Sequence, residues 1–430
     1  MSQAKVIADD IARQHRRGAC PTLAEPMQTG DGLLARFRPI GNALSLEALA
    51  AIAEAAAAFG NGLIEITGRG SLQVRGLSAE TAPEFADAIL RAVEVEQGVP
   101  VETPPLAGLD PGERRDPRPL AARLREAIAA RGLVGRLSPK VTVIVDAGGR
   151  HTLSGLMADV RVMAVEDGWT VAMADARYIC DSDEAVVVQV LCLLERIAMR
   201  GTLARGRDFG PAPAIDPSAS RLGLGISDAA QGGEIVGLGL ALGSITAFAL
   251  KEFAAAAGAA GASGIRLAPG RGLYVHSLSW GAPLLALAAR LGLIAAPADP
   301  RLAMSACAGR EACASGTIAT RSVAAEIAGA APALFDGSFE LHVSGCAKGC
   351  AHPRPALLTL VGEDGECGLI INGRAGDGAV IRFPAQRAVS GFVALEALFR
   401  ASRYAQESAS ACLTRLGAQA IAAAFTQGWR

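Results

Sequence analysis

Two long stretches of this chain, offset by 202 residues, have the same order of apolar runs and glycines. In the first stretch, an apolar run at 33–39 is followed by an alanine-rich segment to Phe59, two short apolar runs separated by Gly68-Arg69-Gly70, and a segment with helical periodicity at 78–97. The second stretch repeats this order around Gly270-Arg271-Gly272. Alternating short runs predict strands, and the longer segments predict helices. The repeat therefore predicts two βαββα units related by duplication.

The segment after each repeat also has a counterpart in the other half. A helical segment, a strand and a pair of strands are predicted at 120–131, 141–146 and 160–173, and again at 323–330, 339–343 and 356–371. The order A-B-A′-B′ predicts an α+β protein with two half domains and two α/β units around a central cleft, where sizeable ligands bind. The expected boundaries are an arm (1–28), half domain 1 (29–99), α/β unit 1 (100–210), half domain 2 (218–296) and α/β unit 2 (297–430).

Only the last unit has a cysteine quartet. Cys307 and Cys313 have five residues between them, and Cys346 and Cys350 have three. Four thiolates are the usual ligands of an iron–sulfur cluster, and neighbouring glycines let the backbone approach it closely. Zinc is the competing metal, although its structural sites favour pairs separated by two to four residues. Four unrelated buried thiols are the third alternative.

The remaining composition narrows the class of protein. The formal net charge is −1, from 41 Lys and Arg against 42 Asp and Glu, which argues against nucleic acid or an anionic membrane as a partner. Nine cysteines without a signal-like leader indicate a reducing, cytoplasmic location. No apolar run reaches the ~20 residues that span a bilayer. Cys192 lies in an apolar segment and is expected to pack in the core, as are Cys180, Cys367 and Cys412.

Basic residues at turns and strand edges form a second signal. Arg69 and Arg271 each lie between glycines at a predicted turn, where a guanidinium can bind a carboxylate through two hydrogen bonds. A solvated hairpin arginine is the alternative. Together with a pair on one face of a strand and two lysines, they predict a pocket for a ligand with several carboxylates. The candidate residues are Arg36, Arg38, Arg69, Lys140, Arg271 and Lys348.

The quartet, its late position in an A-B-A′-B′ chain and the basic turn of the first repeat resemble the sulfite and nitrite reductase haemoproteins over nearly the whole chain. The resemblance implies a duplicated ferredoxin-like pair plus two α/β units. It also implies that the four cysteines bind a [4Fe–4S] cluster, and that in a reductase the last, Cys350, bridges to the iron of sirohaem. Arg69 matches an arginine that binds tetrapyrrole carboxylates in that family.

One departure changes the expected chemistry. The reductases have a Lys-x-Lys pair facing their anionic substrate, whereas Lys140 is followed here by Val141 and Thr142. Stretches 16–36 and 105–110 resemble a branch of the same family in aerobic cobalamin biosynthesis. That branch implies a monooxygenase that converts precorrin-3A, O2 and reductant into precorrin-3B by ring hydroxylation and lactone formation. A ferredoxin-type donor, or NADH through a reductase, would supply the electrons.

The resemblance further implies an additional non-haem iron. The sequence alone does not reveal a set of two histidines and one carboxylate for it, because the five histidines are scattered along the chain: His15, His151, His276, His342 and His352. Two alternatives stay open at this point. One is a sirohaem-dependent sulfite or nitrite reductase, and the other is a non-catalytic iron–sulfur electron carrier or zinc-stabilised module.

Overall fold

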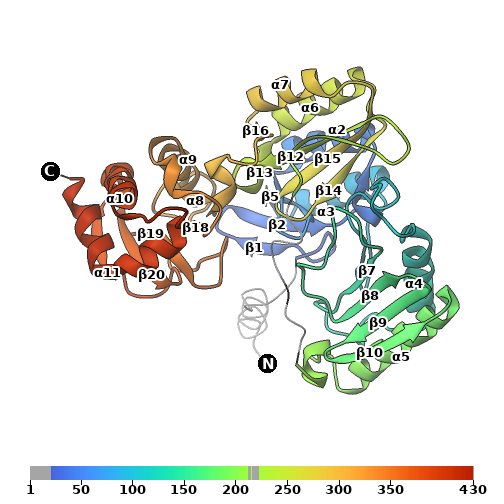
Figure 1. The fold of residues 1–430 in the computed structure, drawn as a ribbon. Helices are drawn as coiled ribbons and strands as arrows, with labels where there is room; N and C mark the ends of the chain where they lie inside the picture. Colours follow the sequence, from blue (N-terminus) through green and yellow to red (C-terminus); the bar gives the residue numbers. More distant parts are fainter. Residues whose placement is uncertain (1–20, 212–214, 216–221, 430) are drawn as a thin grey trace, which may run out of the picture. The chain divides into compact units, whose positions relative to one another are not determined.

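The computed structural model describes residues 21–211, 215 and 222–429, so most of the predicted arm (1–28) lies outside the described residues. The chain forms two compact units (Figure 1). Of the described residues, unit 1 comprises those in 21–28, 33–240 and 244–295, and unit 2 comprises those in 29–32, 241–243 and 296–429. The mixture of sheets and helices confirms the predicted α+β class.

The predicted repeat is present in unit 1 as two half domains. The first contains β1 (Met27–Thr29), β2 (Gly32–Phe37), α2 (Leu46–Phe59), β4 (Leu63–Ile66), β5 (Leu72–Leu77) and α3 (Thr81–Ala92). The second contains β11 (Gly225–Asp228), β12 (Glu234–Leu240), α6 (Ala247–Ala259), β14 (Gly264–Ala268), β15 (Gly272–Leu278), α7 (Ala282–Arg290) and β16 (Leu293–Ile294). The helices and strands therefore recur in the order that the sequence predicts.

The two half domains exchange short strands. Strand β3 (Ala43–Leu44) leaves the first half domain and pairs with β14 of the second, where Leu44 lies opposite Ile265. Strand β13 (Ser244–Thr246) pairs in the same way with β4, where Ile245 lies opposite Ile64. The sheets are ordered β1-β2-β5-β4-β13 and β11-β12-β15-β14-β3. Each half domain thus covers a sheet edge of the other, which removes an edge that could pair with another chain.

The alanine-rich helices explain how the half domains share one core. Helices α2 and α6 pack against each other, and alanines such as Ala53, Ala56, Ala254 and Ala257 are buried in a core that draws residues from both halves. Small side chains let helix axes approach closely. Ser45 caps α2 by accepting a hydrogen bond from the Ala48 amide at 3.1 Å.

The two Gly-Arg-Gly turns meet each other. The amide of Gly270 donates to the carbonyl of Gly68 at 3.1 Å. Gly70 has a φ of 80°, and a Cβ there would lie 3.1 Å from the carbonyl carbon of Ala268. Both constraints favour glycine. Gly70 is therefore explained by the packing of turn against turn, without reference to a ligand.

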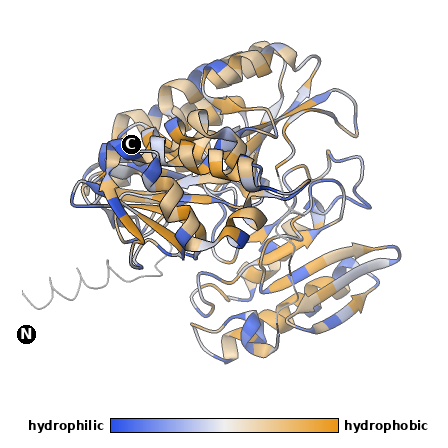
Figure 2. Cartoon of the chain, turned by 60° about the vertical axis from the view of Figure 1, so that its left-hand side comes forward, coloured by the Kyte–Doolittle hydropathy of each residue, from blue (hydrophilic) through white to orange (hydrophobic). Residues whose placement is uncertain are grey.

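Each unit also contains an α/β sheet of the same topology. In unit 1 the sheet order is β10-β9-β8-β7-β6, with helices α4 and α5, and in unit 2 it is β17-β18-β19-β20-β21, with helices α8 to α11. The three strands that come first along the chain, β6 to β8 in unit 1 and β17 to β19 in unit 2, are parallel, and the remaining pairs are antiparallel. Apolar residues run through the strands (Figure 2).

The elements of the α/β sheet in unit 1 are β6 (Val101–Glu102), α4 (Arg118–Ala130), β7 (Val143–Asp146), β8 (Val160–Val165), β9 (Gly168–Met173), β10 (Ala176–Cys180) and α5 (Asp183–Met199). Those of unit 2 are β17 (Met304–Ala306), α8 (Gly309–Ala312), α9 (Thr320–Ala330), β18 (Leu341–Ser344), β19 (Ala356–Glu363), β20 (Glu366–Gly373), β21 (Ile381–Pro384), α10 (Ala388–Ser402) and α11 (Ala409–Gln427).

Two further predictions concern the cysteines outside the quartet and membrane-spanning helices. Cys180, Cys367 and Cys412 are buried as predicted, whereas Cys192 is exposed on α5, so its predicted place in the core is wrong. An apolar sequence neighbourhood did not determine which face of the amphipathic helix Cys192 occupies. Among the described residues, no helix is long and apolar enough to cross a bilayer.

Candidate functional site

The cysteine pairs follow two neighbouring parallel strands of unit 2. Cys307 comes directly after β17, and Cys346 comes two residues after β18. In the register of these strands Ser305 lies opposite His342, so both strands end at the same edge of the sheet. The amide of Gly345 donates to the sulfur of Cys307 at 3.2 Å. The topology thus brings together two loops that are far apart in the sequence.

Glycines pack the cysteine loops tightly against each other. A Cβ on Gly345 would lie 3.0 Å from the Cα of Gly316 and 3.3 Å from that of Gly309. A Cβ on Gly30 would lie 2.5 Å from the sulfur of Cys313, and the Gly30 carbonyl accepts a hydrogen bond from the Ala314 amide. Backbone this close to thiols, with an amide directed at a sulfur, fits a thiolate-ligated iron–sulfur cluster.

The side chains around the quartet are partly open to solvent. Cys307, Cys313 and Cys346 are half-buried and Cys350 is exposed. Lys348, also exposed, connects the two loops because its Nζ donates to Ser315 Oγ at 3.0 Å. As the side chains stand, no three His, Cys, Asp or Glu groups of the described chain are close enough to hold a metal ion. Binding a cluster therefore requires the thiols to turn towards one another.

Two of the predicted basic residues are brought together in unit 1. Nη2 of Arg69 lies 3.0 Å from both carboxylate oxygens of Glu102, and Nη1 of Arg69 donates to the Met157 carbonyl at 2.9 Å. Nη1 of Arg38 lies 3.3 Å from the same carboxylate. The side chain of Glu102 is 2% exposed and that of Arg69 is 36% exposed. An internal carboxylate, which sequence reasoning missed, thus orients both guanidinium groups.

The other basic candidates have separate surroundings. Arg36 donates through Nε and Nη2 to Gln73 Oε1, its partner across strands β2 and β5. Arg271 lies in the turn before β15 with a φ of 66°. Lys140 is exposed in the turn before β7. Among the described residues of unit 1, Arg38 and Arg69 are therefore the members of the predicted set that share one side-chain partner, Glu102.

The loops of unit 1 that correspond to the cysteine loops contain carboxylates and a histidine. Asp110, after β6, accepts hydrogen bonds from the amides of Arg150 and His151 at 2.6 and 3.1 Å. His151 Nδ1 lies 3.1 Å from the hydroxyl of Tyr274. Burial raises the pKa of Glu113, in the same loop as Asp110, to about 7. The two sheets thus share a topology but present different chemistry at the same edge.

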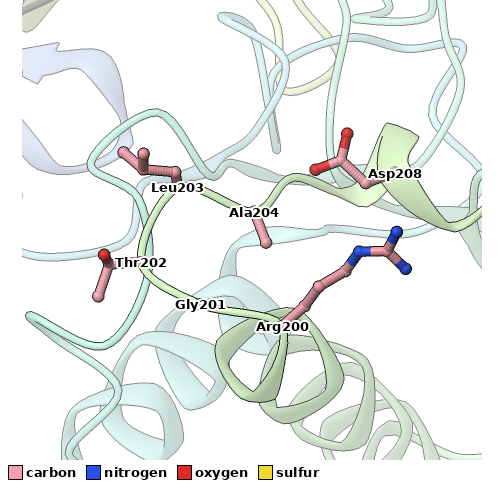
Figure 3. Close-up of a pocket in the computed structure, with 6 residues that line it drawn as sticks. All are labelled: Arg200, Gly201, Thr202, Leu203, Ala204 and Asp208. Atoms are coloured by element: carbon pink, nitrogen blue, oxygen red, sulfur yellow. The ribbon is translucent and has the colours of Figure 1, made fainter.

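A surface hollow of about 420 Å³ lies elsewhere in unit 1 (Figure 3). It is lined by Arg200, Gly201, Thr202, Leu203, Ala204 and Asp208, between the end of α5 and η2 (Gly206–Phe209). None of the predicted ligand-binding residues lines it. We therefore place the candidate site at the cysteine loops.

Known proteins resemble this chain at three levels. Residues 25–92 match the model of the nitrite/sulfite reductase ferredoxin-like half domain. The structure of the Mycobacterium tuberculosis NirA protein superimposes with a TM-score of 0.64 at 17% identity, covering 90% of this chain and 84% of that chain. A precorrin-3B synthase from Sinorhizobium sp. is 43% identical, covering 96% of this chain and 95% of its own length.

The fold and the matching half domain are those of proteins built like nitrite and sulfite reductases. This confirms the predicted duplicated architecture. Identity of 43% over nearly the full length of both chains is more specific than the fold. The chain belongs to the precorrin-3B synthase family.

Proposed function

We propose that this protein is an iron–sulfur monooxygenase that converts precorrin-3A to precorrin-3B in a reducing, cytoplasmic setting. One oxygen atom of O2 enters the tetrapyrrole as a ring hydroxyl, the other leaves as water, and two electrons come from an external donor. A ring acetate then closes the lactone. The principal support is the 43% identity to a precorrin-3B synthase across almost the whole chain. The four cysteines on adjoining loops support the iron–sulfur part.

Cys307, Cys313, Cys346 and Cys350 would hold the [4Fe–4S] cluster, which when bound passes single electrons. The protein stabilises the negative charge of this ligand set through its backbone, since the Gly345 amide already donates to the Cys307 sulfur. Gly30 keeps space free beside the Cys313 sulfur. The backbone around both cysteine pairs is thus positioned to accept thiolates.

Binding of a polycarboxylate substrate falls to the basic residues. Arg69 is fixed by Glu102 and by the Met157 carbonyl, yet 36% of its side chain is exposed, so donors remain for a substrate carboxylate. Arg38 is 12% exposed and serves mainly to hold Glu102. Lys140 and Lys348 are exposed and present point charges. Arg36 and Arg271 complete the proposed set.

The direct test is turnover by protein whose cluster has been reconstituted anaerobically. Mixed with precorrin-3A, a low-potential electron donor and O2, it should form a product heavier by one oxygen atom, detected by mass spectrometry. The same mixture without O2 should leave the substrate unchanged. Absence of product with an intact cluster, or equal product without O2, would refute the proposal.

The sirohaem alternative makes a different spectroscopic prediction. A bound isobacteriochlorin would add strong Soret and red bands to the protein as purified. The proposed enzyme should show only a broad iron–sulfur shoulder near ~400 nm that dithionite bleaches, because its chromophore is a thiolate-ligated cluster. Zinc without iron in the metal analysis would point instead to a structural module.

A further inference from the structure

His342 is a buried polar residue whose ring nitrogens are not hydrogen-bonded. It lies within β18, its side chain is inaccessible to solvent, and neither Nδ1 nor Nε2 forms a hydrogen bond with any residue that the structure describes. Leaving a buried donor or acceptor unsatisfied typically costs ~1–3 kcal/mol of stability. Native proteins seldom tolerate this without a compensating partner or ligand. The environment of His342 therefore indicates a group that completes it.

Two residues that can bind a metal lie beside His342. The ring of His352 is 5.6 Å from that of His342, centroid to centroid, and Nδ1 of His352 is 3.5 Å from Oε2 of Glu340. Glu340 directly precedes β18, two positions before His342, so the alternation of an extended chain would place their side chains on one face. Two imidazoles bound to one ion place their ring centres about 5 Å apart, given metal–nitrogen bonds of about 2.0–2.1 Å.

A second unpaired group lies next to His342. Ser305 faces it across strands β17 and β18, is 2% exposed, and its hydroxyl also forms no hydrogen bond within the described part of the chain. A histidine that binds a metal through one ring nitrogen usually donates its other N–H to a nearby acceptor. Ser305 Oγ is positioned in the register to be that acceptor. One bound ion would thus account for both unsatisfied side chains.

We propose that Glu340, His342 and His352 bind a mononuclear non-haem iron next to the cysteine quartet. This deepens the proposed function, on which it rests for the identity of the metal. Two histidines and one carboxylate are the ligand set typical of non-haem Fe(II) sites with open positions. The side chains of His352 and Glu340 are 13% and 34% exposed, so the open coordination positions of the iron would face solvent on the side of these two residues. In the structure, the three side chains are not close enough together to hold a metal ion. The Glu340 carboxylate must therefore rotate away from His352 and towards the ion.

The site lies directly beside the cluster loop. His352 follows Cys350 by two residues, and a Cβ on Gly349 would lie 3.7 Å from Cε1 of His342. The loop between Cys346 and His352 therefore folds over the face of β18 that presents His342. Iron and cluster would share one short segment, all within unit 2.

The test measures iron and acid-labile sulfide in protein reconstituted with Fe(II) and sulfide. Wild type should contain one iron atom more than its sulfide content and, after reduction, give the EPR signal of a ferrous non-haem iron nitrosyl with nitric oxide. Glu340→Gln and His352→Ala should lower the excess iron and that signal at least ~10-fold, while the cluster absorption remains. His276→Ala, which changes a half-buried histidine of unit 1, is the matched control and should keep both.

His342→Ala opens a cavity and can prevent folding. The test therefore relies on the variants at the two partly exposed positions, Glu340→Gln and His352→Ala. Excess iron retained by both variants, or absent from wild type, would overturn the site. Loss of the cluster together with the excess iron in both variants would also overturn it, since the residues would then support the cluster. The proposed function is judged separately, by conversion of precorrin-3A. Conversion without excess iron would refute this site alone.

Discussion

Both carboxylate oxygens of Glu102 lie 3.0 Å from Nη2 of Arg69, and Glu102 is almost completely buried. Arg38 approaches the same carboxylate at 3.3 Å. Two guanidinium groups thus share an internal anion, which could not be predicted from the sequence. Arg69 is held in place by this ion pair and still exposes part of its guanidinium, so orientation and substrate binding are compatible in one residue.

Glu102→Ala should destabilise unit 1 markedly, because it leaves two guanidinium groups without their anion. We expect a loss of about 2–4 kcal/mol in the free energy of unfolding, less than for a wholly buried pair since Arg69 reaches solvent. Urea denaturation measures this loss. Unfolding free energies of variant and wild type within ~0.5 kcal/mol would show that the pair contributes little.

Arg69→Ala should weaken binding of the tetrapyrrole more than it weakens the fold. Loss of a charge-assisted contact typically costs ~1.5–3 kcal/mol, a rise in Kd of about 10- to 150-fold. Glu102 keeps Arg38 as a partner in this variant, so the loss of stability should be smaller. Titration of precorrin-3A gives the Kd, with Arg91→Ala, an exposed arginine on α3, as the control. Equal affinity in wild type and Arg69→Ala would remove Arg69 from the site.

Glu113 should make the stability of unit 1 fall as the pH rises. Burial raises its pKa in the folded protein to about 7, and one of its oxygens is buried without a partner. At pH values between the ordinary carboxyl pKa and about 7, Glu113 is therefore protonated in the folded state and ionised in the unfolded state. Stability from this group is fully present below about pH 4.3 and is lost as the pH rises through 7.

Glu113→Gln isolates this effect, since the amide does not titrate and its oxygen can still accept from the Gly108 amide. The free energy of unfolding of both proteins is measured with urea at pH 5 and pH 8. The value for the variant minus that for wild type should be larger at pH 8 than at pH 5 by about 1–3 kcal/mol. Other titratable groups are common to both proteins, so their contributions cancel in the difference. A difference independent of pH would contradict the raised pKa.

Gly30→Ala should impair cluster binding. The added Cβ would lie 2.5 Å from the Cys313 sulfur and 2.9 Å from the Ala314 amide, closer than real atoms approach. We expect iron and acid-labile sulfide to fall at least several-fold. Gly329→Ala is the matched control: this glycine lies in α9 with nothing within 4 Å of a new Cβ, and the change should add about 0.4–1 kcal/mol of stability. Equal iron content in both variants would argue against the tight packing around Cys313.

Cys350→Ser should abolish the cluster and all turnover. Cys192→Ser, at an exposed cysteine of α5, should leave both unchanged and controls for thiol loss in general. Iron and sulfide analysis with the absorption spectrum measures the effect. Oxygen-dependent conversion at the normal rate by Cys350→Ser would show that the quartet is structural.

The sequence predicted the repeated architecture because its signals are local. Glycine stops, a capping serine and apolar periodicity mark elements wherever they occur, and the offset of 202 residues aligns them. The exchange of β3 and β13 was not predictable, because strands of two and three residues have no periodicity to detect. Helices α10 and α11 were also missed, although Ser408 caps the second by accepting from the Ala411 amide.

The candidate site was predictable only in part. Cysteine spacing predicts the quartet as a ligand set, since metal ligation imposes a spacing that packing does not. Glu102 and the neighbours of His342 depend on contacts between distant segments: Glu102 lies 33 residues from Arg69, and His352 is brought beside His342 by a loop that folds back. A period-two match of Glu340 with His342 is present in the sequence, but many strands have such pairs. Only the unsatisfied imidazole distinguishes this one.

The most direct test of the account is the origin of the oxygen in the product. Reconstituted protein should be supplied with precorrin-3A, reductant and ¹⁸O2, and the precorrin-3B analysed by mass spectrometry. The account predicts one ¹⁸O atom per product molecule, with none incorporated from ¹⁸O-labelled water under ¹⁶O2. Product oxygen derived from water, or reduction of sulfite or nitrite in place of any reaction with precorrin-3A, would contradict it.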